Sequence, residues 1–169
     1  MSRTMHLLVF TLDDQRFALP ATVVRETVAA VAITPLPAAP AVVDGVVDVR
    51  GQIVPVYDLR VRFGRPRRPV RASEHFVIAS AGDKTVALRV DRALELVSVV
   101  EADLLPAAAD DPRFDRVAGI ARLQDGLVLV QDLAAFLSDS EAATLDRALT
   151  EHRRARSADS SPKSPGSRA

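Results

Sequence analysis

The chain is dominated by short apolar runs separated by pairs of turn-forming residues. The runs are rich in Val, Leu and Ile, and the pairs between them are Asp-Asp, Arg-Gly, Gly-Asp and Asp-Gly, a pattern that favours β-strands. Prolines punctuate the first half, so long helices are not expected there. Strands are predicted at residues 6–12, 15–19, 42–49, 53–57, 75–80, 85–90, 94–100, 117–123 and 127–131. Many short strands with turns between them are typical of an all-β sandwich or barrel.

The C-terminal part of the chain departs from this pattern. Apolar residues spaced between charged ones predict short helical segments at about 132–150, divided by the Asp/Ser break at 138–141. From Glu151 to Ala169 the chain is Arg, Ser, Pro and Gly with almost no apolar residue, so we expect 151–169 to be a disordered tail.

The two halves of the chain resemble each other. Residues that match at an offset of 69 are His6 with His75, Asp14 with Asp83, Ala18-Leu19 with Ala87-Leu88, Glu26 with Glu95 and Pro37 with Pro106. After an insertion of about five residues near 110–115 the offset becomes 74, and residues 45–49 then match 119–123. The matches include Gly, Asp, Glu and Pro in the same order, whereas chance similarity among Val-rich strands, the alternative, would match apolar positions alone.

This repeat predicts two homologous lobes of about five strands each within one domain at 5–150. Lobe 1 is expected at about 5–64 and lobe 2 at about 75–138. Two lobes packed edge to edge would bury their open strand edges and leave a groove between them. A groove of this kind is a binding surface, which favours an adaptor protein.

Composition and charge narrow the class of protein. Hydrophobic residues make up 48% of the 169 residues and charged residues 26%, enough to bury a core. The formal net charge is +0, from 22 basic and 22 acidic residues, so no overall field favours nucleic acid or an anionic membrane. There is no cysteine, and no apolar run approaches the roughly 20 residues of a membrane span. We expect a soluble, cytoplasmic protein.

No constellation of residues predicts catalysis, a metal site or a cofactor. The chain has no G-x-S-x-G, and Gln52 stands where a phosphate-binding loop starting at Gly45 would need Lys. The three histidines are not at metal-ligand spacing from one another, and the paired carboxylates at 13–14 and 110–111 lie in turns. The chain is therefore predicted to be non-enzymatic.

Six arginines lie between residues 60 and 71, in the connector between the predicted lobes. They are either a solvated, mobile linker or a basic patch for nucleic acid or an acidic partner. A small-barrel nucleic-acid-binding protein therefore stays open as an alternative from another class.

Arg50-Gly51 lies between two predicted strands and is predicted to form a hairpin tip. The favoured two-residue turn needs a positive φ at both positions, which Gly supplies without strain and Arg does not. The corresponding tip in the second half is Asp125-Gly126. An Arg at an unfavourable turn position indicates that its side chain is needed, unless it is simply tolerated there.

The same residues resemble the CheW family of chemotaxis coupling proteins. The motifs that carry the resemblance are Leu12 to Leu19, Val24-x-Glu26, Ile33-Thr-Pro-Leu-Pro37, Pro40, Val43-x-Gly45-Val-Val-Asp-Val-Arg-Gly51, Ile53-Val-Pro-Val-Tyr-Asp-Leu-Arg60-x-Arg62-Phe63-Gly64, Ala87-Leu-Arg-Val-Asp91, Glu95, Gly119-Ile120 and Leu127 to Leu133. They span roughly Met5 to Ser138.

The resemblance implies two SH3-like five-stranded β-barrel lobes and a role in signal transduction. It implies a scaffold that couples the cytoplasmic signalling tip of methyl-accepting chemoreceptors to the regulatory domain of a chemotaxis histidine kinase, in membrane-associated arrays. Receptor-binding residues implied by it are Arg50, Gly51, Val24, Glu26, Leu96 and Gly119; kinase-binding residues are Val24, Glu26 and Gly45.

Two features depart from the family pattern. The family usually has Asn where Asp48 stands, which could alter the turn beside Arg50, and the arginine-rich connector and the tail are additions. A specialised paralogue that binds only the receptor or only the kinase, in a pathway for pili or surface sensing, is the alternative within the class.

Overall fold

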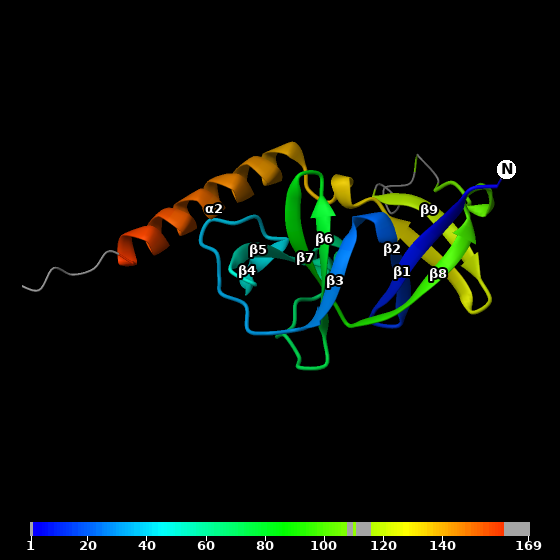
Figure 1. Cartoon of the computed structure of the whole chain (residues 1–169), viewed down its shortest axis with the longest axis horizontal. Coiled ribbons are helices and arrows are strands. Elements are labelled where there is room, and N and C mark those ends of the chain that lie inside the picture. The colour runs from blue at the N-terminus through cyan, green and yellow to red at the C-terminus, as the bar shows by residue number, and fades with distance from the viewer. Residues whose placement is uncertain (1, 108–109, 111–115, 161–169) are drawn as a thin grey trace, which may run out of the picture.

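A computed structural model describes residues 2–107, 110 and 116–160 (Figure 1). The strands are β1 (Thr4–Leu12), β2 (Gln15–Pro20), β3 (Val24–Ala29), β4 (Val43–Val49), β5 (Gln52–Asp58), β6 (His75–Ala81), β7 (Lys84–Val90), β8 (Arg92–Val100), β9 (Val117–Leu123) and β10 (Gly126–Gln131). Short helical turns are η1 (Ala21–Val23), α1 (Leu59–Arg62), η2 (Glu101–Asp103) and η4 (Leu133–Ala135), and a long helix α2 spans Asp139–Asp159. The all-β class is confirmed, with β3 the one strand that was not predicted.

The strands form two five-stranded sheets, and each sheet takes strands from both halves of the sequence. Sheet A has the order β8-β1-β2-β10-β9 and sheet B the order β3-β6-β7-β5-β4. The predicted lobes at about 5–64 and 75–138 are therefore wrong as structural units, because the first hairpin of each half joins the last three strands of the other. The chain changes sheets after β2 and again after β7. The edges of the β1–β2 hairpin pair with β8 and β10, and the edges of the β6–β7 hairpin pair with β3 and β5.

The duplication itself is confirmed by the strand register. In β1–β2 Leu8 pairs with Leu19, and 69 residues later Val77 pairs with Leu88. In β4–β5 Val47 pairs with Val54, and 74 residues later Ala121 pairs with Val128. Positions that correspond in this way are called twins below. One predicted match is wrong: the bridges Thr34–Val46 and Leu105–Ile120 are twins, so Pro106 corresponds to Pro35 rather than to Pro37.

Each sheet has an inner face with its own small core. The cores are twin sets: Leu7, Val9, Ala18, Ala121, Val128 and Val130 in sheet A, and Phe76, Ile78, Ala87, Val47, Val54 and Val56 in sheet B. The outer faces of the two sheets pack against each other and against α2 in a third, larger core. Alternation of side chains along each strand produces both faces, because neighbouring residues point to opposite sides.

Helix α2 begins with a capping box, in which Ser138 accepts from the backbone N–H of Glu141 and Glu141 reaches back to the N–H of Ser138. Leu145, Ala148 and Leu149 form its buried stripe. The helix continues to Asp159, so the predicted disordered tail is wrong for residues 151–159, and residues 161–169 lie outside the described residues. Within the described part of the chain, no helix has both the length and the hydropathy to cross a membrane.

Candidate protein-binding site

The β4–β5 hairpin turns through Arg50 and Gly51, as predicted. Val49 pairs with Gln52, and the two turn residues have φ of 52° and 83°. Both values are positive, the requirement of a tight hairpin turn that matches strand twist. The side chain of Asp48 accepts a 2.7 Å hydrogen bond from the N–H of Gly51, so Asp at this position supports the turn.

Glu26 on β3 holds the Arg50 side chain by two parallel hydrogen bonds of 2.7 and 2.6 Å. Arg50 remains 77% exposed, whereas Glu26 is 26% exposed. An exposed ion pair of this kind contributes no more than about 1 kcal/mol to stability. Its main effect is to fix the direction of the guanidinium, which leaves the remaining donors and the stem open to a partner.

The other predicted site residues divide into exposed and buried positions. Val24 lies on β3 with Glu26 and packs partly on the large core. β3 and β4 are opposite edge strands of sheet B, and the Glu26–Arg50 pair joins β3 to the tip of the β4–β5 hairpin. Leu96 is 67% exposed on β8, the twin strand of β3 in sheet A.

Gly45 and Gly119 are twins, and both are buried. A Cβ on Gly45 would lie 2.2 Å from the carbonyl oxygen of Thr34, so glycine is needed for close backbone approach. A Cβ on Gly119 would lie 3.5 Å from the Leu105 carbonyl oxygen, an ordinary contact. The structure therefore gives Gly45 a packing role, and Gly119 packs beneath the segment that carries Leu105.

The twin hairpin in sheet A is built differently. Leu123 pairs with Gly126, so the turn residues are Gln124 and Asp125 rather than the predicted Asp125-Gly126. Neither has a positive φ, and the positive φ of 126° falls on Gly126. Asp125 binds Arg16 of β2 at 3.1 Å. This tip has no counterpart of the Glu26–Arg50 pair, because Gln124 is uncharged.

A buried cluster of charges beside sheet B was missed by the sequence analysis. Arg60, Arg89, Glu74 and Asp58 are each 1–2% exposed. Arg89 donates to Glu74 at 2.9 Å and to Asp44 at 2.8 Å. Burial opposes the charge of Arg89, but these hydrogen bonds outweigh burial and raise its pKa. Burial, with help from Asp44, raises the pKa of Asp58. The signal in the sequence is Arg89 itself, a charge inside an apolar strand.

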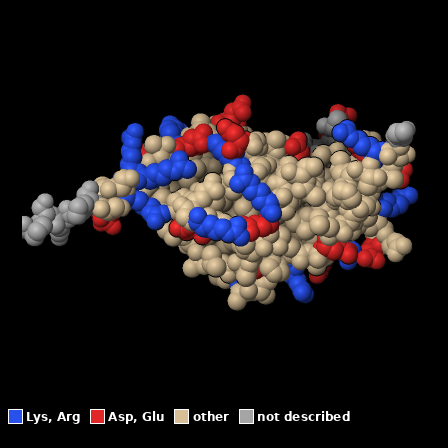
Figure 2. Space-filling view, in the orientation of Figure 1, with Lys and Arg blue, Asp and Glu red and all other residues tan. Residues whose placement is uncertain are grey.

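The arginine-rich connector is part of this cluster, so its interpretation as a mobile linker is wrong. The contacts are Arg60 with Asp91, Arg62 with Glu141 at 2.7 Å, Arg65 with Asp13 at 2.7 Å, Arg67 with Asp44 at 3.6 Å and Arg68 with Asp91 at 2.6 Å. The hydrogen bond from Arg65 lowers the pKa of Asp13. Figure 2 shows basic side chains lying beside acidic ones over the middle of the molecule. A nucleic-acid interface therefore finds no support in these arginines.

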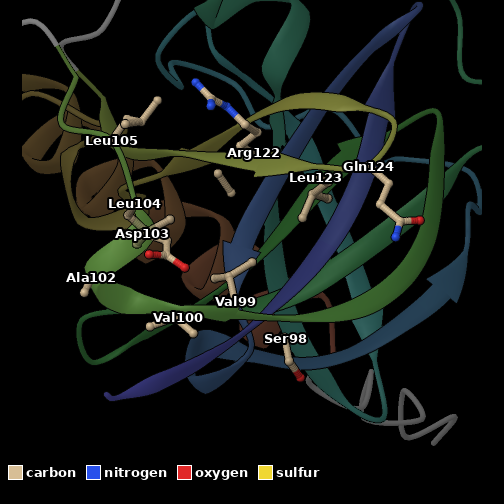
Figure 3. Close-up of a pocket in the computed structure, with 11 residues that line it drawn as sticks. Ser98, Val99, Val100, Ala102, Asp103, Leu104, Leu105, Arg122, Leu123 and Gln124 are labelled. Atoms are coloured by element: carbon tan, nitrogen blue, oxygen red, sulfur yellow. The ribbon is translucent and has the colours of Figure 1, made fainter. Parts of the chain in front are cut away.

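A groove of about 720 Å³ lies at one end of the inner face of sheet A (Figure 3). Val99 and Leu123 point into it from β8 and β9, and Leu104 closes it from the connection between them. Its apolar floor is continuous with the small core of sheet A. No sequence motif marked this groove, because its lining comes from β8, β9 and the connections beside them, none of which carries a motif.

Two duplicated sheets that present a fixed arginine and an apolar groove define a protein-binding module. The family model described as CheW-like domain matches residues 6–141, and the chain belongs to this family. It is 26% identical over 137 residues to the chemotaxis protein CheW of Rhizobium meliloti, covering 80% of this chain and 88% of that protein. Protein FrzA of Myxococcus xanthus is 29% identical over 97 residues, which cover 57% of this chain and 61% of FrzA.

The fold agrees with a solved member of the family. The crystal structure of the scaffolding protein TtCheW from Thermoanaerobacter tengcongensis superimposes with a TM-score of 0.74 at 26% identity, over 83% of this chain and 92% of that one. The fold described here is therefore shared with that scaffolding protein.

Proposed function

We propose that this chain is a non-catalytic scaffold that couples chemoreceptors to a chemotaxis-type histidine kinase at cytoplasmic, membrane-associated arrays. The observation that carries the proposal is Arg50, which sits in a left-handed turn conformation and is aimed by Glu26 while largely exposed. A strained conformation combined with a fixed, exposed, charged side chain is typical of a binding residue.

The receptor-facing surface is assigned to the place where β3, with Val24 and Glu26, meets the β4–β5 tip, with Arg50 and Gly51. Leu96 is a further contact on sheet A. Gly45 and Gly119 support these surfaces from beneath, since both are buried. A carboxylate or backbone carbonyls on the receptor tip would suit the guanidinium donors that Glu26 leaves free.

A coupling protein must hold two partners at once, so it needs a second surface. The kinase regulatory domain is assigned Val24 and Glu26 in common with the receptor. The groove between β8 and β9 is the second, apolar surface assigned to the kinase alone. Leu123→Asp would place a charge on the groove floor. It should weaken kinase binding and leave receptor binding near the wild-type value.

The test of the receptor surface is a titration of wild type and Arg50→Asn against the receptor signalling tip and the kinase regulatory domain separately. Receptor affinity should fall by about 1–3 kcal/mol, the scale of a charge-assisted hydrogen bond lost at an interface. Kinase affinity should change less.

Arg16→Ala is the matched control, because Arg16 forms the ion pair of the twin hairpin. It should leave both affinities unchanged. An Arg50→Asn protein that is folded and binds the receptor tip like wild type would refute the assignment. Wild type that binds only one of the two partners would instead identify a specialised paralogue.

A further inference from the structure

The outer face of the β4–β5 hairpin is covered by a helix, whereas that of its twin, β9–β10, is exposed. On β4–β5, Val46 and Ile53 face outward and are covered by α2. The buried stripe of α2 joins the same core as Val46 and Tyr57, and His152 and Arg156 line a small pocket with Asp48 and Ile53. Burial, together with Asp146 of α2, raises the pKa of Tyr57 to about 12, which agrees with the helix lying across β5.

On β9–β10, the twin residues are Ile120 for Val46, Leu127 for Ile53, Arg122 for Asp48 and Leu105 for Thr34. Leu127 is 58% exposed and Leu105 is 41% exposed, and they are two of the five large apolar residues most open to solvent among those described. Figure 3 shows Arg122 leaving β9 on the side opposite to Leu123, which points into the groove. Arg122 and Leu105 also border the groove, so the outer face adjoins the groove there, while Ile120 and Leu127 lie outside its lining.

The strand register of the two hairpins is the same residue for residue, so the β9–β10 face has the shape that accepts a helix on β4–β5. The charge at the end of the face is reversed. Asp48 shares its pocket with the basic His152 and Arg156 of α2, whereas its twin is the exposed Arg122. A helix that fits this face needs acidic residues where α2 has basic ones.

We propose that the outer face of β9–β10, formed by Ile120, Leu127, Leu105 and Arg122, docks an amphipathic helix of a partner protein. The helix presents an apolar stripe spaced like Leu145, Ala148 and Leu149 of α2, with carboxylates one to two turns further on that meet Arg122. This surface lies outside the receptor-facing residues of β3 and the β4–β5 tip, and it does not depend on the proposed coupling function.

The test uses helical peptides against the whole chain. The probe has the sequence of residues 138–159, held helical by a side-chain lactam on its solvent side, with the substitutions His152→Glu and Arg156→Glu. The control peptide keeps the native His152 and Arg156. The acidic probe should shift backbone amide resonances of β9 and β10, and it should bind at least about fivefold more tightly than the control.

Two variants of the chain decide the outcome. Leu127→Asp should weaken binding of the acidic probe about tenfold by removing apolar contact. Arg122→Glu should reverse the preference, so that the native-sequence peptide binds better than the acidic one. Absence of binding, binding unaffected by both variants, or resonance shifts confined to β4–β5 would overturn the proposal.

Discussion

Sheets A and B share their strand pairings and the positions of their inner cores, but they differ in what surrounds them. In sheet B the buried Arg89 pairs with the buried Glu74 and the partly buried Asp44, and α2 covers the outer face of the sheet. The twins of those three residues are Pro20, Met5 and Ala118, which carry no charge. A duplicated fold is thus held by backbone register and inner packing, while outer faces and strand ends are free to diverge into binding surfaces or charge clusters.

Separating the two halves should have the largest effect, because each sheet needs strands from both. Residues 1–69 alone supply β1 and β2 without β8 and β10, their partners in sheet A. We expect each fragment, 1–69 or 70–169, to show no cooperative thermal unfolding, and the two expressed together to recover it. A monomeric 1–69 fragment that melts sharply would contradict the exchanged arrangement.

Among single substitutions, removing Arg89 from the buried cluster should lower the free energy of unfolding most. Arg89→Ala leaves Glu74, Asp44 and Asp58 without their main counter-charge, and we expect a loss of about 3–5 kcal/mol in denaturant unfolding. The loss should shrink as pH falls, since protonation removes the unpaired negative charge. At the twin position, Pro20→Ala should cost no more than about 1 kcal/mol. Similar losses at both positions would show that the charges are not what distinguishes the sheets.

The twin glycines provide a finer comparison. Gly45→Ala forces its Cβ against the Thr34 carbonyl, and we expect a loss of about 2–3 kcal/mol in the free energy of unfolding. Gly119→Ala meets only ordinary contacts and should cost less than about 1 kcal/mol. Urea unfolding of both variants measures the difference. Equal losses in the free energy of unfolding would mean that the backbone at Thr34 can move away from the added Cβ.

The smallest effect concerns the acid sensitivity of α2, which lies over the β4–β5 hairpin of sheet B. Burial raises the pKa of Glu141, but hydrogen bonds from Arg62 and Ser138 outweigh it and hold the pKa below the ordinary 4.5. The carboxylate therefore stabilises the fold above about pH 4.5, and this contribution is lost as pH falls through the lowered value. Glu141→Gln should lose about 1 kcal/mol at pH 7 and flatten the acid limb of the stability curve.

Amide hydrogen exchange can show which part of the chain loses stability when Glu141 is protonated. In wild type at low pH, protection should fall first in the opening turns of α2 and not in β9 or β10. Uniform loss of protection across both sheets would show that the acid transition is global and that Glu141 does not control it.

Most of the strand positions followed from sequence because apolar runs and turn pairs are local signals. Strand β3 was missed since Val24-Arg-Glu-Thr-Val-Ala carries alternating polar residues, although its twin β8 was predicted and the repeat pointed back to it. The exchange of hairpins could not be predicted, because the pairings of β1 with β8 and of β2 with β10 depend on contacts between the halves that the sequence of neither half specifies.

The candidate site was predicted in part. The Arg50-Gly51 turn followed from hairpin chemistry, but the bidentate contact with Glu26 needs the distance between β3 and the hairpin tip, which no local pattern contains. The connector arginines could not be told from a basic patch, because their acidic partners at Asp13, Asp91 and Glu141 are distant in sequence. The groove at Val99 and Leu123 is a property of packing alone.

The pairing of Leu8 with Leu96 joins residues that are 88 positions apart in the chain. At a ribosomal rate of roughly 5–20 residues per second, β1 is synthesised about 4–18 seconds before the strand that covers its edge. During that interval the first hairpin carries an open apolar edge, of the kind that recruits other nascent chains. Slower translation through residues 70–96 should therefore lower the soluble yield of this protein, and added chaperone should restore it.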